Sequence, residues 1–324
     1  MPSLATLTLT LLTLSACDRG TPPATTLEAA VQGIHGAALS DNGRFAAIGS
    51  INHGGSLWRI KDGERLYNWN HKANAFTTIL NADFSPEGNW AITADPHTMV
   101  LWSMKDGSSF RFWTAPGEIL SISLAPEGEL ALLGLDDHTA TIFDVKRGGI
   151  KRTFHHANRV RSVAFSNDAR RAISGSEDYT ASVWNVASGK AINSFKHNDE
   201  VHLVSLSPNG KQAFSVAKYD RAVLWDVDTG KAIGSTKLNA EKLRRGMTYT
   251  TAKFSNDGRQ LLTGRPDQII ELWDTRNLER LHRWELPKRD AWQPTSSAAA
   301  AVGFGSNGEY FAVGSNGYVH RLER

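Results

Sequence analysis

Histidine and carboxylate residues gather in one stretch of the sequence that could support metal or acid–base chemistry. His155 and His156 are adjacent, and Asp136, Asp137 and His138 lie shortly before them. A zinc site needs three or four ligands that converge on the metal at about 2 Å. His156 and Asp137, however, also stand at fixed places in a repeat that runs through the chain. We therefore expect these residues to be structural, and we expect no metal and no other cofactor.

Two further segments resemble ligand-binding loops in sequence. Residues 303–308 have the glycine spacing of a dinucleotide-binding fingerprint, but they follow one apolar stretch and precede another, so no helix starts there. Residues 226–230 begin like a calcium-binding loop, but no Glu follows at its twelfth position. The chain also lacks G-x-S-x-G, H-E-x-x-H and paired-cysteine motifs. We predict no catalytic residue and no small-molecule substrate.

A short apolar segment at the N-terminus ends at Cys17, the only cysteine in the chain. Residues 4–16 are too few to span a bilayer and have the length of a signal-peptide core. The sequence Leu14-Ser15-Ala16-Cys17 resembles the lipobox of bacterial lipoproteins, although residues 1–3 lack the usual basic residue. The resemblance implies a signal peptide over residues 1–16, cleavage before Cys17, and fatty acids such as palmitate on that cysteine.

The residues after Cys17 suit a membrane tether. Residues 17–26 are polar and contain two prolines, so they predict a semi-extended segment that reaches under roughly 30 Å. In enterobacterial lipoproteins, an Asp directly after the lipidated Cys is associated with retention at the inner membrane. Asp18 therefore favours the periplasmic face of the inner membrane over the outer membrane.

The rest of the chain is organised by a repeated turn. A turn rich in Ser, Pro, Asn, Asp and Gly returns every 40 to 50 residues, which is the period of propeller blades. The seven copies begin at Leu39, Phe84, Leu124, Phe165, Leu206, Phe254 and Phe304. Six copies are followed after a nearly constant gap by an aromatic residue, namely Trp58, Trp102, Phe143, Trp184, Trp225 and Trp273. In the last copy, His320 stands shortly before the chain ends.

Each copy predicts antiparallel strands joined by tight hairpins. Residues 160–186 show this pattern clearly, because three stretches with period-two alternation are separated by turn residues. A sheet of this size cannot bury both of its faces alone, so neighbouring copies must stack around a ring.

These residues resemble the WD-repeat β-propeller family. The dipeptide that names the family stands at Trp225-Asp226 and Trp273-Asp274. The resemblance implies an all-β, seven-bladed propeller over residues 27–324, whose last blade is completed by a strand over residues 27–31. It also implies a hydrogen-bonded tetrad in the fourth repeat, formed by His156, Ser174, Asp178 and Trp184. The fifth repeat has His197, Ser215 and Trp225 with Asp220 displaced by one position, and the third and sixth keep only Asp137 and Asp267.

The longest connections between repeats indicate where a partner would bind. Residues 70–76, 239–249 and 286–297 all join the last strand of one repeat to the first of the next, so they should emerge on one face. Arginine and aromatic residues are enriched at binding hot spots. The candidate partner-binding residues are Lys72, Phe76, Arg244, Arg245, Tyr249, Lys288, Arg289 and Trp292. The alternative is that Tyr249 and Trp292 pack under their own loops.

Composition narrows the class of partner. The net charge of +3 is mild, and the sequence shows no concentrated basic face, so we predict no nucleic-acid binding. We expect a membrane-anchored, non-catalytic interaction platform in an envelope assembly, binding an acidic protein surface or the anionic headgroup region. The alternative is an enzyme or small-ligand binder that uses the central channel mouth.

Overall fold

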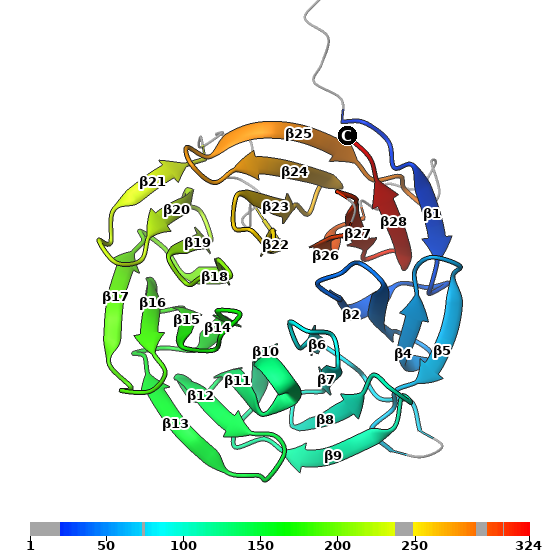
Figure 1. Cartoon of the computed structure of the whole chain (residues 1–324), viewed down its shortest axis with the longest axis horizontal. Coiled ribbons are helices and arrows are strands. Elements are labelled where there is room, and N and C mark those ends of the chain that lie inside the picture. Colours follow the sequence, from blue (N-terminus) through cyan, green and yellow to red (C-terminus); the bar gives the residue numbers. More distant parts are fainter. Residues whose placement is uncertain (1–19, 73–74, 237–248, 290–296, 307) are drawn as a thin grey trace, which may run out of the picture.

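The computed structural model describes residues 20–72, 75–236, 249–289, 297–306 and 308–324. Within these ranges the chain forms seven four-stranded antiparallel sheets, arranged as blades around a central channel (Figure 1). The predicted all-β, seven-bladed propeller is confirmed.

The strands follow one another from the channel outwards in each blade. Blades one to three contain β2 (Ile34–Leu39), β3 (Phe45–Ser50), β4 (Gly54–Arg59) and β5 (Glu64–Asn68); β6 (Asn81–Phe84), β7 (Trp90–Ala94), β8 (Thr98–Ser103) and β9 (Ser109–Thr114); and β10 (Ile119–Leu124), β11 (Leu130–Leu135), β12 (Thr139–Asp144) and β13 (Ile150–His155). Blades four and five contain β14 (Val160–Phe165), β15 (Arg171–Ser176), β16 (Thr180–Asn185) and β17 (Ala191–Lys196); and β18 (Val201–Leu206), β19 (Gln212–Ala217), β20 (Ala222–Asp226) and β21 (Ala232–Ser235). Blades six and seven contain β22 (Thr251–Phe254), β23 (Gln260–Gly264), β24 (Ile269–Asp274) and β25 (Glu279–Glu285); and β26 (Ala299–Phe304), β27 (Tyr310–Gly314), β28 (Tyr318–Leu322) and β1 (Thr25–Glu28). A single 3-10 turn, η1 (Pro126–Gly128), follows β10.

The repeated turn is held by its serine. In blade four, the Ser166 hydroxyl accepts a hydrogen bond from the Arg171 N–H at 3.1 Å and donates one to Asp168 at 2.7 Å. The same serine-to-backbone bond closes the turns at Ser40, Ser85, Ser207 and Ser255. The turn needs a positive φ at its fifth residue, which Gly43 provides at 67° without steric cost. The turn chemistry therefore explains why this motif repeats.

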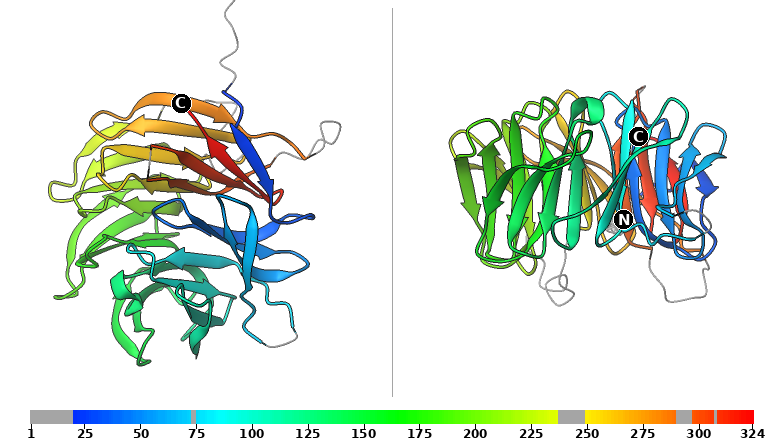
Figure 2. Two further views of the ribbon diagram at one scale, coloured as in Figure 1. Left: turned by 45° about the vertical axis from the view of Figure 1, so that its right-hand side comes forward. Right: turned by 90° about the horizontal axis from the view of Figure 1, so that it is seen from below.

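Strand alternation sends the connections to two different faces. The hairpins between the first and second strands and between the third and fourth strands form one face, here called the short-turn face. The hairpins between the second and third strands and the links from each outer strand to the next blade form the other, here called the long-loop face. The side view in Figure 2 shows the strands running between these faces.

The ring is closed by the N-terminal segment. Strand β1 pairs antiparallel with β28, with Thr26 opposite His320, so the last blade draws its outer strand from the other end of the chain. The strand begins two residues earlier than the expected residue 27 and ends at Glu28 rather than at residue 31. Closure in this way leaves no unpaired strand between the first and last blades.

Hydrophobic clusters fill the wedges between neighbouring blades, and stacked aromatic rings take part in some of them. Trp69 stacks on Trp102 with ring centroids 5.3 Å apart, and Phe154 stacks on Trp184 at 4.8 Å. Blade seven lacks the repeated aromatic residue that the other blades have in the third strand. At the register where blade six pairs Leu261 with Trp273, blade seven pairs Phe311 with Arg321. His320 is therefore one position away from the place of the repeat aromatic.

Candidate functional site: the channel and the long-loop face

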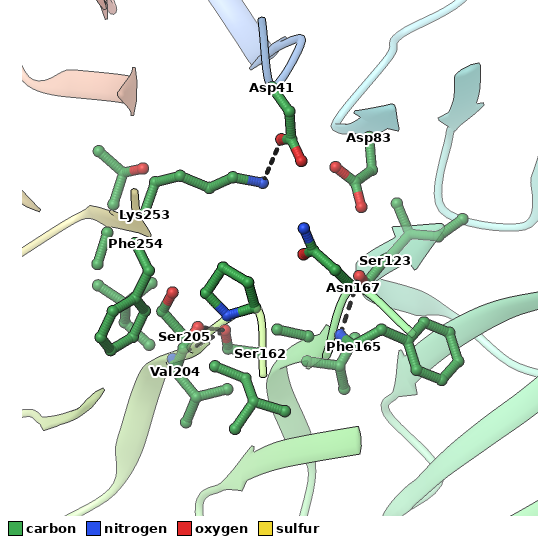
Figure 3. Close-up of a pocket in the computed structure, with 18 of the residues that line it drawn as sticks. Asp41, Asp83, Ser123, Ser162, Phe165, Asn167, Val204, Ser205, Lys253 and Phe254 are labelled. Atoms are coloured by element: carbon green, nitrogen blue, oxygen red, sulfur yellow. Dashed lines mark hydrogen bonds and ion pairs between the residues drawn. The ribbon is translucent and has the colours of Figure 1, made fainter. Parts of the chain in front are cut away.

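A cavity of about 230 Å³ lies in the central channel. Strands β6, β10, β14, β18 and β22 line it, together with residues of the repeated turns at the short-turn face. Figure 3 shows polar side chains around this space, among them Asp41, Asp83, Asn167 and Lys253. They come from blades one, two, four and six, so the cavity is a site that the ring assembles.

An ion pair crosses the channel. The Lys253 Nζ lies 2.8 Å from an Asp41 carboxylate oxygen, and this contact joins blade six to blade one past blade seven (Figure 3). The Asp41 side chain is only 8% exposed. Burial disfavours the ammonium, but the carboxylates of Asp41 and Asp83 outweigh it and raise the pKa of Lys253. The lysine therefore stays charged and links two blades that are not neighbours.

Asp83 forms a second kind of link, a hydrogen bond to the backbone of the next blade. One carboxylate oxygen accepts the Leu124 N–H of the next blade at 2.8 Å, and the other accepts the Phe84 N–H at 2.9 Å. Burial raises the pKa of Asp83, and nearby Lys253 opposes that rise. Serine hydroxyls repeat the interblade bond to the N–H groups of Val163, Phe165 and Val204, from Ser121, Ser123 and Ser162 respectively.

The chemistry that this cavity offers is polar binding. The described residues that line it include no histidine and no cysteine, and two of its serines, Ser123 and Ser162, accept backbone N–H groups of neighbouring strands. A hydroxyl nucleophile needs an adjacent base to activate it. The described channel residues form no such pair, whereas their hydrogen bonds connect blades two, three, four and five.

The long-loop face carries exposed apolar side chains. Nine large hydrophobic residues are exposed among the described residues, and six of them lie in connections on this face: Val31, Ile51, Phe76, Leu80, Tyr179 and Tyr219. The other three, Phe110, Phe112 and Ile150, lie on outer strands. The described turns of the short-turn face contain none. The two faces therefore differ strongly in character.

Four of these residues gather where blades seven, one and two meet, and we call Val31, Ile51, Phe76 and Leu80 the apolar patch. Phe76 is 70% exposed, and its only ring contact with a described residue is the edge of His53, with centroids 6.0 Å apart. Ile51 bonds through its N–H to Gly33 O at 3.2 Å, two residues after Val31. Contiguous exposed apolar surface is typical of interaction sites.

The residues predicted to bind a partner differ in exposure, and some of them lie outside the described residues. Lys72 and Phe76 are exposed on the connection between blades one and two, and Lys288 is exposed after β25. Arg244, Arg245 and Trp292 lie outside the described residues, as does Cys17. The structure therefore brings Phe76 and Lys72 together on one loop, but leaves the basic pair at 244–245 unplaced.

Tyr249 is buried, and Arg289 is exposed but already makes contacts within the chain. Tyr249 is 5% exposed, and its hydroxyl donates to Glu271 at 3.4 Å, so it packs inside the protein, whereas the rest of its loop lies outside the described residues. Arg289 donates to Glu28 at 2.6 Å and to the carbonyls of Ala30 and Asn316 at 2.7 Å each, and its guanidinium also lies over the Tyr318 ring. Through these contacts, Arg289 connects the segment after β25 to the closing strand.

The fourth blade contains the hydrogen-bonded tetrad that its sequence resembles. The His156 Nδ1 lies 2.9 Å from an Asp178 carboxylate oxygen, and its Nε2 lies 2.7 Å from the Ser174 hydroxyl. The Trp184 Nε1–H donates to the same hydroxyl at 2.7 Å. His155 is exposed and opposes Thr139 in the neighbouring strand. The adjacent histidines therefore face different surroundings.

Blade two contains most of a second tetrad, which was missed from the sequence. His71 Nε2 lies 3.0 Å from the Thr93 hydroxyl, which also accepts the Trp102 Nε1–H at 2.8 Å. His71 Nδ1 lies 2.8 Å from the Thr98 hydroxyl and 3.5 Å from Asp95. Burial lowers the pKa of His71, although Asp95 opposes that shift. His71 precedes its hydroxyl partner by 22 positions, whereas His156 precedes Ser174 by 18, and this longer gap concealed the set.

Blade five retains most of the tetrad. The His197 Nε2 lies 2.7 Å from the Ser215 hydroxyl, and Trp225 donates to that hydroxyl at 3.1 Å. The displaced Asp220 lies 3.6 Å from His197 Nδ1, so the pair is an ion-pair distance apart without a hydrogen bond. The one-residue shift explains the looser contact.

The described residues contain no group of three or more His, Cys, Asp or Glu side chains that could hold a metal ion. Within the same residues, no helix has the length and apolar character to cross a membrane.

Comparison with known proteins identifies the repeat. Residues 148–185 match the family model described as WD domain, G-beta repeat, and they cover β13, which forms the outer edge of blade three, and most of blade four. A search of curated proteins found no match. The matched segment contains the complete tetrad, and the same strand order recurs in every other blade. One repeat of the chain thus matches the WD40 family, and the described residues as a whole form a seven-bladed β-propeller closed by an N-terminal strand.

Proposed function

We propose that the protein is a lipid-anchored, non-catalytic platform of the bacterial envelope that binds a protein partner on its long-loop face. WD40 propellers typically act as interaction scaffolds, so the fold supports this class of function. The observation that carries the proposal is the uneven distribution of exposed apolar side chains, which lie on the long-loop face and the outer strands and not in the described short turns.

Two exposed tyrosines add a second argument for binding on this face. Tyr179 and Tyr219 lie in turns of the long-loop face and are 43% and 50% exposed. The Tyr179 ring stacks on no other aromatic ring among the described residues, and a tyrosine is well suited to the centre of an interface. We infer that a partner contacts these rings.

The sequence supports anchoring through Cys17. Cleavage before this residue and lipidation of its thiol and amino group would place the ring in the periplasm. Asp18 favours the inner membrane. The partner would then be an envelope protein that reaches the long-loop face close to the bilayer.

Site-specific photo-crosslinking in the native membrane tests the binding face. A photo-reactive residue replaces Phe76 or Tyr179 on the long-loop face, and matched controls replace Asn256 on the short-turn face or Ile150 on the outer wall. We expect one envelope protein to be captured from both positions on the long-loop face and from neither control. Equal capture from all four positions would refute the proposed face. Binding of the purified partner, weakened by Phe76→Ser and not by Ile150→Ser, completes the test.

Metabolic labelling with an alkyne fatty acid tests the anchor separately. The wild-type chain should incorporate the label and sediment with membranes. Cys17→Ser should do neither.

A further inference from the structure

The segment expected to be a tether is bound to the ring over most of its length. Thr21 forms a parallel bridge with Trp284 of β25, through hydrogen bonds from the Thr21 N–H to Arg283 O at 2.9 Å and from the Glu285 N–H to Thr21 O at 3.0 Å. The Thr21 hydroxyl also lies 3.1 Å from His282 Nε2. Residues 20–28 therefore pair first with blade six and then, as β1, with blade seven.

The contact with blade six is close. A Cβ on Gly20 would lie 2.4 Å from the Trp284 carbonyl carbon, so only glycine fits this approach without movement of the backbone. Pro22 and Pro23 continue along the outer wall beside residues 285–288. In Figure 1, the first described residues lie at the outer edge of the ring, beside β25 and the C-terminus.

This attachment limits the distance between a lipid on Cys17 and the protein. Only three residue steps separate Cys17 from Gly20, and a fully extended chain covers at most about 11 Å in three steps. The expected tether length of roughly 30 Å therefore does not apply. Resting on the lipid anchor of the proposed function, we propose that the outer wall of blades six and seven faces the bilayer and that the ring stands on its edge.

Reach alone permits a second orientation, with the long-loop face on the membrane, because Gly20 lies near the long-loop end of the wall. A ring lying face-down would cover the apolar patch, Tyr179 and Tyr219, which the proposed function leaves open to a partner. The edge-on orientation is therefore the one that agrees with the proposed binding face.

The edge-on orientation leaves both faces open along the bilayer surface. The apolar patch adjoins blade seven, so it lies on the side of the ring nearer the membrane. The surface that it offers therefore fits an envelope protein whose binding segment lies close to the bilayer.

Quenching by lipid headgroups tests the orientation. Residues 17–324, which include the whole closed ring, are coupled through the Cys17 thiol to a maleimide lipid in vesicles of phosphatidylethanolamine and phosphatidylglycerol with spin-labelled headgroups. A fluorophore is placed through a noncanonical residue at Arg324 on the wall, Asp137 on the long-loop face, or Ile150 on the opposite wall. We expect several-fold stronger quenching at position 324 than at either other position.

Two outcomes would overturn the proposal. Quenching at Asp137 that equals quenching at Arg324 would mean that the long-loop face lies on the membrane. Equal quenching at all three positions would mean that the ring has no fixed orientation. A variant with about twenty Gly and Ser residues inserted after Asp18 is the control, because a long flexible linker should abolish the difference.

Chemical coupling separates this test from the proposed anchor. The purified protein acquires its lipid in vitro, so the orientation is measured whether or not cells lipidate Cys17. Failure of fatty-acid labelling in cells would refute the anchor alone.

Discussion

Acidification should loosen the seventh blade, because His320 is buried there in its neutral form. The side chain is 0% exposed, and its Nδ1 lies 3.0 Å from the Thr26 hydroxyl of the closing strand. Its Nε2 has no hydrogen-bond partner. Burial lowers the pKa of His320 to about 4, from an ordinary value of 6.5. The fold therefore excludes the imidazolium that an unfolded chain would readily form.

The sign and size of the effect follow from this pKa. A base whose pKa is depressed by folding contributes its full stability above pH 6.5 and loses it as the pH falls from 6.5 towards 4. The whole difference corresponds to about 3 kcal/mol below both values, and about 2 kcal/mol of it should be lost by pH 5.

Urea unfolding of residues 20–324, followed by tryptophan fluorescence, measures this loss. The free energy of unfolding should fall between about pH 7.5 and pH 5 by about 2 kcal/mol more in the wild type than in His320→Asn, which cannot titrate there. His71, His197 and His202, whose pKa values burial also lowers, titrate in both proteins and cancel in the comparison. An equal loss in both proteins, or an NMR titration of His320 near its ordinary pKa, would refute the reasoning.

Three further predictions concern the ring. Ser174→Ala should lower the free energy of unfolding by about 2 kcal/mol, because it leaves His156 and the Trp184 N–H without their shared partner, and calorimetry with the exposed Ser188→Ala as control would show it. Lys253→Met should destabilise the protein by about 1 kcal/mol near pH 7, because Asp41 loses its partner. Adding Asp41→Asn should restore most of that loss in urea unfolding, and no restoration would contradict the pairing. Deleting residues 20–28 should expose the edge of β28 and cause self-association in size-exclusion chromatography, and a monomer as stable as the wild type would show that closure is dispensable.

The blades could be predicted from the sequence because short, local sequence patterns determine their turns and strands. The repeated turn depends on one serine hydroxyl, an acidic or amide side chain and a residue with positive φ, all within six positions. Strand alternation then fixes which residues face the neighbouring blade. The closing strand could also be anticipated, since the last repeat had only three strands and an unused segment preceded the first.

Contacts between distant residues could not be predicted from sequence. The hydrogen bonds of Arg289 to Glu28 and Ala30 join positions more than 250 residues apart, so the sequence did not show that this exposed side chain contacts the closing strand. The channel ion pair depends on Lys253 and Asp41 meeting across the ring, and no local pattern marks it. The exposed surface was anticipated through Phe76, but Val31, Ile51 and the two tyrosines carried no signal because each stands singly in a short connection.

The segment that closes the ring is also the segment that would carry the proposed lipid anchor, and this has a consequence for how the protein would respond to force. Residues 20–23 lie against blade six and residues 25–28 pair with blade seven, so tension on a lipid at Cys17 would act first on the Thr21–Trp284 bridge. That bridge has only two backbone hydrogen bonds, whereas β1 is held by four residue pairs and by the Arg289 contact to Glu28. Residues 20–23 should therefore detach before β1 does, lengthening the tether while the ring stays closed. The order of these contacts would keep the ring closed under tension on the proposed anchor.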